Sequence, residues 1–188
     1  MAGRHSFNEV FIDNVRIHQK FLVGNENEGF RQIMAQVDHE RAGLERLMQN
    51  YPVYQDLIKI SRTDPHIKKD PEFYAWVKNA IADIEIEYNV GRLLCYYTAW
   101  LIDQGKQPSS QAALTKAFCT QLEQKINDLA TQVLGPSSLI KGTPNSKPPL
   151  FINDLYESYL WGPSYTLQGG SVEVLKNIVA LRGLKMPR

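Results

Sequence analysis

The chain has 188 residues, of which 43% are hydrophobic and 22% charged, and its formal net charge is +1. This composition is that of a globular protein, and the length allows one good-sized core and at most two small domains. The nearly neutral charge and the lack of a ~20-residue apolar run exclude a strongly basic nucleic-acid binder and a membrane span, so we expect neither partner. The first residues lack the apolar core of a secretion signal, which favours a cytoplasmic protein. Cys95 and Cys119 fall in apolar helical patterns and are expected to be reduced, and the four histidines lack metal-ligand spacing.

Residues 6–23 are rich in β-branched and aromatic side chains, and Asp13-Asn14 interrupts them as a turn would. This pattern predicts one or two short strands. An isolated hairpin is barely stable in water. We therefore interpret residues 1–24 as the terminal strands of a truncated β-domain.

A helix is predicted from about Glu28 to Tyr51, with Pro52 behind it. Glu40 and Arg41 both fall within its apolar stripe, where buried charge is costly unless it is paired or used. Two readings stay open from the pattern alone: a structural ion pair and a functional pair. The apolar residues of this stripe recur at steps of three and four: Phe30, Ile33, Met34, Val37, Leu44, Leu47 and Met48.

Further helices are predicted along the remaining chain. Asp70-Pro71 is an N-cap followed by proline in the first turn, and it opens a helix that runs to about Asp103. Gly91 interrupts that helix and is expected to permit close helix contact. The other predicted helices cover residues 53–60, 109–134 (capped by Ser109 or Ser110), 153–159 and 171–181, with loop-like residues at 136–150. The predicted fold is mainly α: an up-down four-helix bundle over residues 25–188 with a short N-terminal β segment.

Two glycine-containing turns are the other candidate sites. Gln168 to Ser171, Gln-Gly-Gly-Ser, comes directly before the last helix, where free backbone N–H groups attract anions or polar ligand atoms. An ordinary turn with a serine N-cap explains the same residues. Gln132 to Gly135 at the end of a helix has the same two readings. The sequence contains no G-x-S-x-G, P-loop or G-x-G-x-x-G motif.

Three stretches together resemble the acyl-CoA dehydrogenase family. The first is Phe7 to Ile17 followed by Leu22 to Phe30, which is similar to the last strands of the family's middle β-domain and the entry to its helical domain. The second is Asp38-His-Glu-Arg41. The third is Leu167 to Val174, with Asn177-Ile-Val-Ala and the ending Arg182 to Arg188. Their order and spacing match the family over essentially the whole chain.

The resemblance implies oxidation of an acyl-CoA thioester to 2-enoyl-CoA with FAD. The catalytic base of the family occupies one of two positions. One lies in the C-terminal loop and corresponds here to Gly169, which has no side chain. The other lies in the Asp-x-Glu-Arg motif and corresponds to Glu40, so the resemblance favours Glu40 as the α-proton base. An apolar pocket would raise the pKa of such a carboxylate and suit it to proton transfer.

The resemblance also implies the remaining site residues and an oligomer with acyl-CoA dehydrogenase subunits. The expected substrate-binding residues are Arg31, Asp38, His39, Arg41, Gly169 and Gly170. The expected FAD-contacting residues are Gln132, Val133, Leu134, Gly135 and Pro136, toward a neighbouring subunit, and Ser171, Val172 and Glu173. The sequence departs from the family in lacking an Arg-x-x-Phe-Gly segment after the central helix and in having Gly170-Ser171 for Gly-Thr.

Two hypotheses therefore remain. In the first, the chain is part of an enzyme, the C-terminal half of an acyl-CoA dehydrogenase, and the charged pair Glu40-Arg41 within an apolar stripe favours it. In the second, the chain is a non-catalytic helical subunit or fragment that assembles with a catalytic partner. The departures from the family motifs favour this alternative.

Overall fold

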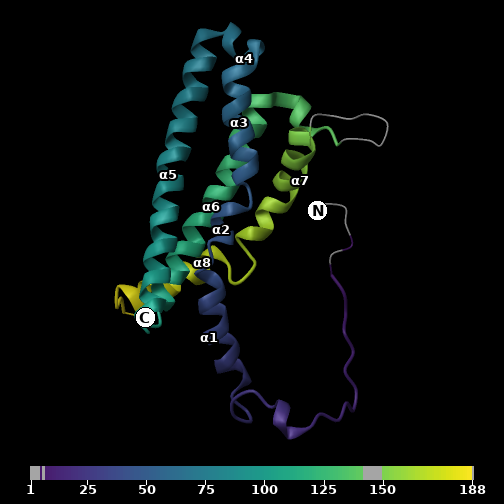
Figure 1. Ribbon diagram of the computed structural model, residues 1–188, viewed down its shortest axis with the longest axis vertical. Helices are drawn as coiled ribbons and strands as arrows, with labels where there is room; N and C mark the ends of the chain where they lie inside the picture. The colour runs from purple at the N-terminus through teal and green to yellow at the C-terminus, as the bar shows by residue number, and fades with distance from the viewer. Residues whose placement is uncertain (1–4, 6, 142–149, 188) are drawn as a thin grey trace.

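The computed structural model describes residues 5, 7–141 and 150–187, and it is mainly helical (Figure 1). The two longest helices, α5 (Pro71–Asp103) and α6 (Ser109–Leu134), run side by side. The other helices are α1 (Gly29–Arg41), α2 (Glu45–Met48), α3 (Tyr51–Thr63), α4 (Pro65–Lys69), α7 (Leu150–Tyr165) and α8 (Val172–Ile178), with 3-10 turns η1 (Gln19–Phe21) and η2 (Gly135–Leu139) and the π-helical turn η3 (Val179–Gly183).

Helix α6 lies at the centre of the fold and contacts α1, α2, α3, α5, α7 and α8. Its sequence explains this position, because alanines at 112, 113, 117 and 130 let neighbouring helices approach on several sides. The main core lies between α3, α5, α6 and α7 and contains Leu57, Val77, Leu122 and Leu155. A predominantly helical fold is confirmed. The four-helix bundle is not, because the helices gather around one central helix.

Local signals placed α5 and α6 correctly. Asp70 accepts hydrogen bonds from the backbone N–H groups of Glu72 (2.9 Å) and Phe73 (3.1 Å), as predicted for an N-cap. The predicted end of α5 at Asp103 and both ends of α6 are confirmed. The predicted serine cap of α6 is wrong: Pro108 is the N-cap residue, and no side chain caps this helix.

The long helix predicted over residues 28–51 is interrupted. α1 ends at Arg41, and the chain turns through Ala42, Gly43 and Leu44 before the single turn of α2. The predicted apolar stripe is consequently split. Leu47 is buried, whereas Phe30 is 79% and Ile33 56% exposed, because the N-terminal part of α1 projects from the bundle (Figure 1).

The N-terminal β segment is not confirmed. The described residues before α1 contain only the 3-10 turn η1 and otherwise follow an extended path away from the bundle (Figure 1). A strand needs a partner for its backbone groups. The large apolar side chains here are all exposed: Phe7, Val10, Phe11, Ile12, Val15, Ile17, Phe21, Leu22 and Val23.

The C-terminal helices differ in length from those predicted. α7 covers Leu150–Tyr165 in place of residues 153–159 and tolerates Pro163 in its last turn. Residues 142–149 of the predicted loop lie outside the described residues. The last helix becomes α8 followed by the π-helical turn η3, which together extend to Gly183.

The core contains a buried carboxyl group, Glu123 of α6, which is 1% exposed. Both of its oxygens lack a hydrogen-bond partner among the described residues, as do the buried amide oxygens of Asn50 and Asn127. Burial raises the pKa of Glu123 to about 8. The backbone N–H groups of Asn50 and Gln49 lie close enough to oppose this shift but do not form a hydrogen bond with the carboxyl group. Glu123 is therefore mainly protonated at neutral pH, which gives it a hydrogen to donate.

Substitution of Gly91 by valine should lower the free energy of unfolding by about 1–3 kcal/mol through overpacking. Gly91 is buried on α5, and a Cβ added there would lie 2.9 Å from Leu47 Cδ1 and 3.4 Å from Cys119 Sγ. The exposed Ala99→Val on the same helix is the control. Urea unfolding measures both variants, and equal stability of the two would show that the close contact at Gly91 is unimportant.

Substitution of Glu123 by glutamine should remove a pH dependence of stability. The folded protein holds the Glu123 proton up to about pH 8, whereas the unfolded chain releases it near 4.5. The wild type therefore loses stability as pH rises through this window, by at most about 1.4 kcal/mol per pH unit from this group. Urea unfolding at pH 5, 6.5 and 8 tests this, with the exposed Glu9→Gln as control. An unchanged slope in Glu123→Gln would mean that Glu123 titrates normally.

Candidate functional site

The candidate site forms where the end of α1 meets the loop between α7 and α8. Arg41, the last residue of α1, is 6% exposed. Its Nε donates a 2.7 Å hydrogen bond to the carbonyl oxygen of Gly169, and its Nη1 contacts Asp38 Oδ1 at 3.2 Å. The Arg41–Gly169 hydrogen bond joins residues 128 positions apart in the sequence.

A second buried cation supports the same loop from α6. Lys116 is fully buried, and its Nζ donates a 2.8 Å hydrogen bond to the carbonyl oxygen of Gly170. Gly170 has φ of +110°, a conformation that favours glycine, and a Cβ there would lie 2.9 Å from Arg41 Nη2. The two glycines therefore let the backbone carbonyls approach both cations closely.

Asp38 connects this cluster to the start of α6. Its carboxylate pairs with Arg41 and also accepts a short hydrogen bond from the Ser109 hydroxyl. A small pocket of about 20 Å³ lies beside this carboxylate and could hold one water molecule. It is lined by Ala35, Asp38, His39, Gln107 and Pro108. His39 itself is exposed.

The structure brings together Asp38, Arg41, Gly169 and Gly170 of the predicted substrate-binding residues but not Arg31. The side chain of Arg31 is 84% exposed and lies 3.8 Å from Glu28. Glu40 is exposed, so the predicted burial of this residue is wrong. The reason is the break after Arg41: only Arg41 and Ala42 enter the interior, while the preceding turns of α1 project from the bundle.

The predicted FAD-contacting residues form two separate groups. Ser171 caps α8 by accepting a hydrogen bond from Val174 N–H at 3.4 Å, Val172 is buried, and Glu173 is exposed beside the glycine loop. The backbone N–H of Glu173 itself and the Ser171 hydroxyl lower the pKa of Glu173. Gln132 to Pro136 lie at the opposite end of α6, and Gln132 is 16 residues, or about 24 Å, from Lys116 along the helix. Gly135 has φ of +62° and open space around its Cβ position.

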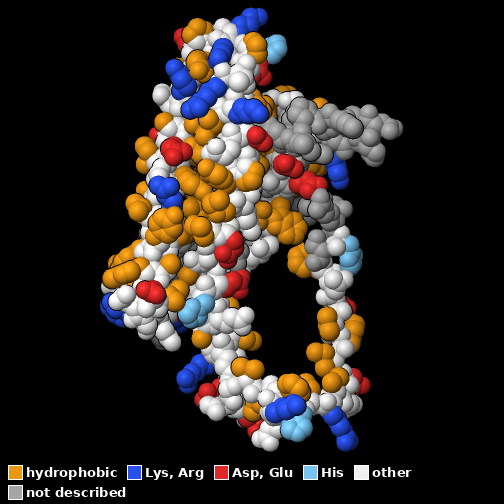
Figure 2. Space-filling model, viewed as in Figure 1, with side chains coloured by type: hydrophobic (Ala, Val, Ile, Leu, Met, Phe, Trp, Pro, Cys, Tyr) orange, Lys and Arg blue, Asp and Glu red, His pale blue; other side chains and the backbone are white. Residues whose placement is uncertain are grey.

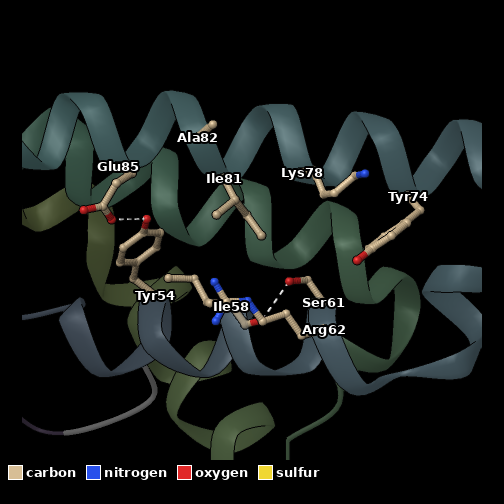
Figure 3. A pocket seen from close by; sticks show the side chains of 9 residues that line it. All are labelled: Tyr54, Ile58, Ser61, Arg62, Tyr74, Lys78, Ile81, Ala82 and Glu85. Carbon is tan, nitrogen blue, oxygen red and sulfur yellow. Dashed lines mark hydrogen bonds between the residues drawn. The ribbon is translucent and has the colours of Figure 1, made fainter.

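A larger groove of about 380 Å³ lies between α3 and α5 and contains none of the predicted site residues. Figure 3 shows the Tyr54 hydroxyl pointing toward Glu85, to which it donates a 2.6 Å hydrogen bond. This bond and burial raise the pKa of Tyr54 well above its usual value, burial being the larger cause. Arg62 and Lys78 stand along the same groove.

Sequence reasoning missed Lys116 and the side-chain role of Ser109. Lys116 lies between alanines at 113 and 117 on a helix whose other buried positions are mainly apolar. A lysine within this small-residue face is the pattern from which its burial could have been predicted. Ser109 was interpreted only as a helix cap. Within residues 5, 7–141 and 150–187, no helix is long and apolar enough to cross a membrane, and no cluster of metal-binding side chains was found.

Residues 27–184 match the family model described as acyl-CoA dehydrogenase, C-terminal domain. The chain therefore belongs to the acyl-CoA dehydrogenase family, which is FAD-dependent. It is 28% identical over 194 residues to the acyl-CoA dehydrogenase FadE29 of Mycobacterium tuberculosis (strain ATCC 25618 / H37Rv), covering 99% of this chain and 47% of the relative. The chain thus spans about half the length of this curated relative.

Solved structures show the same fold. The Tcur3481-Tcur3483 steroid ACAD G363A variant has a TM-score of 0.80 at 26% identity, covering 95% of this chain and 45% of that one. A glutaryl-coenzyme A dehydrogenase in complex with glutaryl-CoA has a TM-score of 0.78 at 22% identity, covering 94% and 43%. The ChsE4-ChsE5 complex from Mycobacterium tuberculosis has a TM-score of 0.69 at 20% identity, covering 88% and 42%.

Substitution of Arg41 by alanine should release the loop between α7 and α8. It removes the donor to Gly169 O and the partner of the part-buried Asp38, which should lower the free energy of unfolding by about 3–5 kcal/mol. Hydrogen exchange of residues 167–172 should accelerate, with Arg31→Ala as the exposed control. Unchanged exchange in Arg41→Ala would mean that the loop is held without the guanidinium.

Proposed function

We propose that this chain forms the C-terminal helical part of a flavin-dependent acyl-CoA dehydrogenase that oxidises an acyl-CoA thioester to 2-enoyl-CoA. Residues 25–188 supply the helical domain, and residues 1–24 supply the last strands of a β-domain. The observation that carries this proposal is the hydrogen bond from Arg41 to Gly169. It joins the Asp38–Arg41 motif to the glycine segment, the two parts of the sequence that contain the family's alternative base positions.

Glu40 is the proposed α-proton base. Its neighbour Arg41 is fixed in the interior, so the backbone of Glu40 is held at the rim of the glycine loop. The alternative base position, Gly169, offers only a backbone carbonyl, which already accepts from Arg41. Glu40 is exposed in this chain. In the complete enzyme the β-domain would cover it, exclude water and increase the basicity of its carboxylate.

The residues proposed to line the acyl-CoA site are Asp38, Arg41, Gly169 and Gly170. Arg41 and Lys116 bind the two glycine carbonyls, and the Gly170 N–H donates to Leu167 O at 3.2 Å, so the backbone groups of the loop are fixed by internal contacts. Such fixed groups position a thioester without reorganising during the reaction. His39 and Arg31 are exposed and would contact more distant parts of the coenzyme A chain.

The residues that would contact FAD fit such a ligand. Gly135 has a left-handed backbone and open space on its Cβ side, so its backbone is accessible to a flat or anionic group, and Gln132 beside it is exposed. Ser171, Val172 and Glu173 open α8 next to the glycine loop. When bound, FAD supplies the acceptor for the hydride from the substrate β-carbon. The ~24 Å between the two groups supports contact of Gln132 to Pro136 with the cofactor of a neighbouring subunit.

A non-catalytic subunit that assembles with a catalytic partner is the second candidate. The exposure of Glu40 and of Phe30 and Ile33 on α1 favours it, because these side chains would then contact a partner protein. The two proposals differ in whether Glu40 acts on substrate.

A chimera tests this directly: residues 1–188 replace the matching half of FadE29, which supplies the missing half. In this chimera Glu40→Gln should lower turnover by about 10²–10⁴-fold while the helical circular dichroism signal persists, because glutamine keeps the shape and removes the base. Exchange of the substrate α-proton with deuterated solvent should fall in parallel. Glu26→Gln, an exposed change of the same kind in the turn before α1, is the matched control.

Near-normal turnover and α-proton exchange in Glu40→Gln would place the base elsewhere. A chimera that folds and binds FAD but lacks turnover even with Glu40 intact would favour the non-catalytic subunit.

A further inference from the structure

A pocket of about 300 Å³ lies between α6 and α7, two helices that pack side by side (Figure 1). Its volume is at the lower end of the range in which proteins hold small organic ligands. Its wall is separate from the residues proposed above to contact acyl-CoA or FAD, so what it binds is independent of the catalytic role of Glu40. We call it the α6–α7 pocket, and it is lined by Gln124, Asn127 and Asp128 of α6 and by Tyr159, Leu160, Gly162 and Pro163 of α7. The hydrophobic side chains visible on the surface in Figure 2 do not identify a ligand by themselves, whereas the polar groups of this pocket do.

The last turns of α7 form one wall of the pocket. Gly162 is buried, and a Cβ there would lie 3.2 Å from Asn127 Nδ2 and 3.7 Å from Gln124 Cγ, so α7 lies close to α6 at this point. Pro163 has no N–H, so the α-helical hydrogen bond to the Tyr159 carbonyl oxygen cannot form. The α7 wall therefore combines a close helix contact with a carbonyl oxygen that lacks its α-helical partner.

The side-chain amides of the α6 wall offer hydrogen-bond acceptors. Asn127 is 1% exposed, and its Nδ2 donates to Ser158 O at 3.0 Å. Its buried Oδ1 has no hydrogen-bond partner among the described residues. The Nε2 of Gln124 is also used, because it donates to Gly162 O at 3.2 Å and to Thr166 Oγ1 at 3.3 Å. Both amides are therefore held through their nitrogens, and a donor for the buried Asn127 oxygen would remove an unfavourable desolvation.

Asp128 adds a negative charge on the same side of α6. Positions 127 and 128 come three and four residues after Gln124, and such positions lie on one face of a helix. Asp128 is exposed, and the ion pairs of the described residues do not include it. Lys125 on the same helix is already bound to Glu87 at 2.7 Å. Because the described residues that line the pocket include no lysine or arginine, its negative charge is uncompensated.

We propose that the α6–α7 pocket binds a small organic ammonium ion, a protonated primary amine on a compact aromatic or aliphatic body. An ammonium group has three N–H donors and no acceptor, so it complements the oxygens of Asn127, Gln124 and Asp128. Hydrogen bonds in which both groups are charged are shorter and stronger than neutral ones. A primary amine is protonated at neutral pH, as the lysine side chain is.

The remaining wall fits the apolar body of such a ligand. Leu160 and Pro163 supply aliphatic surface, and the Tyr159 ring attracts a cation that lies over its face. An anion would meet the Asp128 carboxylate without a cationic side chain to balance it. A neutral molecule of the same shape would gain nothing from that carboxylate. The pocket therefore discriminates by charge as well as by size.

Titration of the full 188-residue chain with 2-phenylethylammonium, followed by ¹H–¹⁵N NMR, tests the proposal. Binding should be saturable and should shift the amide signals of residues 124–128 and 159–162. The neutral 2-phenylethanol should bind at least tenfold more weakly, and 3-phenylpropanoate should leave these signals unchanged. An absence of saturation up to about 10 mM, where even weak specific binding is detected, would mean that the pocket holds only water and would overturn the proposal. Equal binding of the alcohol would also overturn it, because the site would then recognise only apolar shape.

The variant Asp128→Asn tests the charge within the pocket. Asparagine keeps the shape and removes the charge, and the exposure of Asp128 means that the fold should persist. The affinity for 2-phenylethylammonium should fall at least tenfold. Asp83→Asn, the same change at an exposed position of α5, is the matched control and should leave the affinity unchanged. Undiminished affinity in Asp128→Asn, or equal weakening by both variants, would contradict the proposed site.

Discussion

A buried guanidinium at the end of α1 is the contact on which the candidate site depends. Arg41 meets three needs at once: its positive charge lies at the negative end of the α1 dipole, it pairs with Asp38, and it satisfies the carbonyl oxygen of Gly169. The chain leaves the helix immediately after Arg41, through Ala42 and Gly43. The end of α1 and the burial of the Arg41 guanidinium are therefore coupled, because both occur at the same residue.

A line of polar side chains on α6 extends this arrangement through the core. Lys116, Thr120, Glu123 and Asn127 recur at steps of four, three and four, and each is at most 1% exposed. Lys116 donates to Gly170 O, Asn127 to Ser158 O at 3.0 Å, and Asn50 to Glu123 O at 3.1 Å. The first two bonds hold the backbone at Gly170 and Ser158 against α6 through side chains of this line, and the third joins the Asn50 side chain to the α6 backbone. The buried polar side chains come at a cost in desolvation.

Short-range sequence signals made the ends of the two long helices predictable. The cap at Asp70, proline in the first turn and glycine after the last turn act within a few residues, and the ends of α5 and α6 followed from them. The family resemblance assigned Asp38, Arg41, Gly169 and Gly170 to one site; the structure brings these residues together, and their role in a substrate site stays a prediction. The exposure of Glu40 and the burial of Lys116 could not be read from local pattern. They depend on where α1 breaks and on which face of α6 meets the glycine loop, and both are tertiary features.

The largest errors have a common physical cause. Hydrophobic periodicity predicted that Phe30 and Ile33 would be buried, and both are exposed. Periodicity reflects the surroundings in which a helix is stable, whether a segment of its own chain or another polypeptide provides them. The same reasoning applies to α5, on which Ile86, Val90, Leu93, Tyr97 and Trp100 are exposed at steps of three and four residues. Exposed apolar side chains that keep a helical period are therefore expected where a chain meets further protein, as α1 does in the proposed complete enzyme.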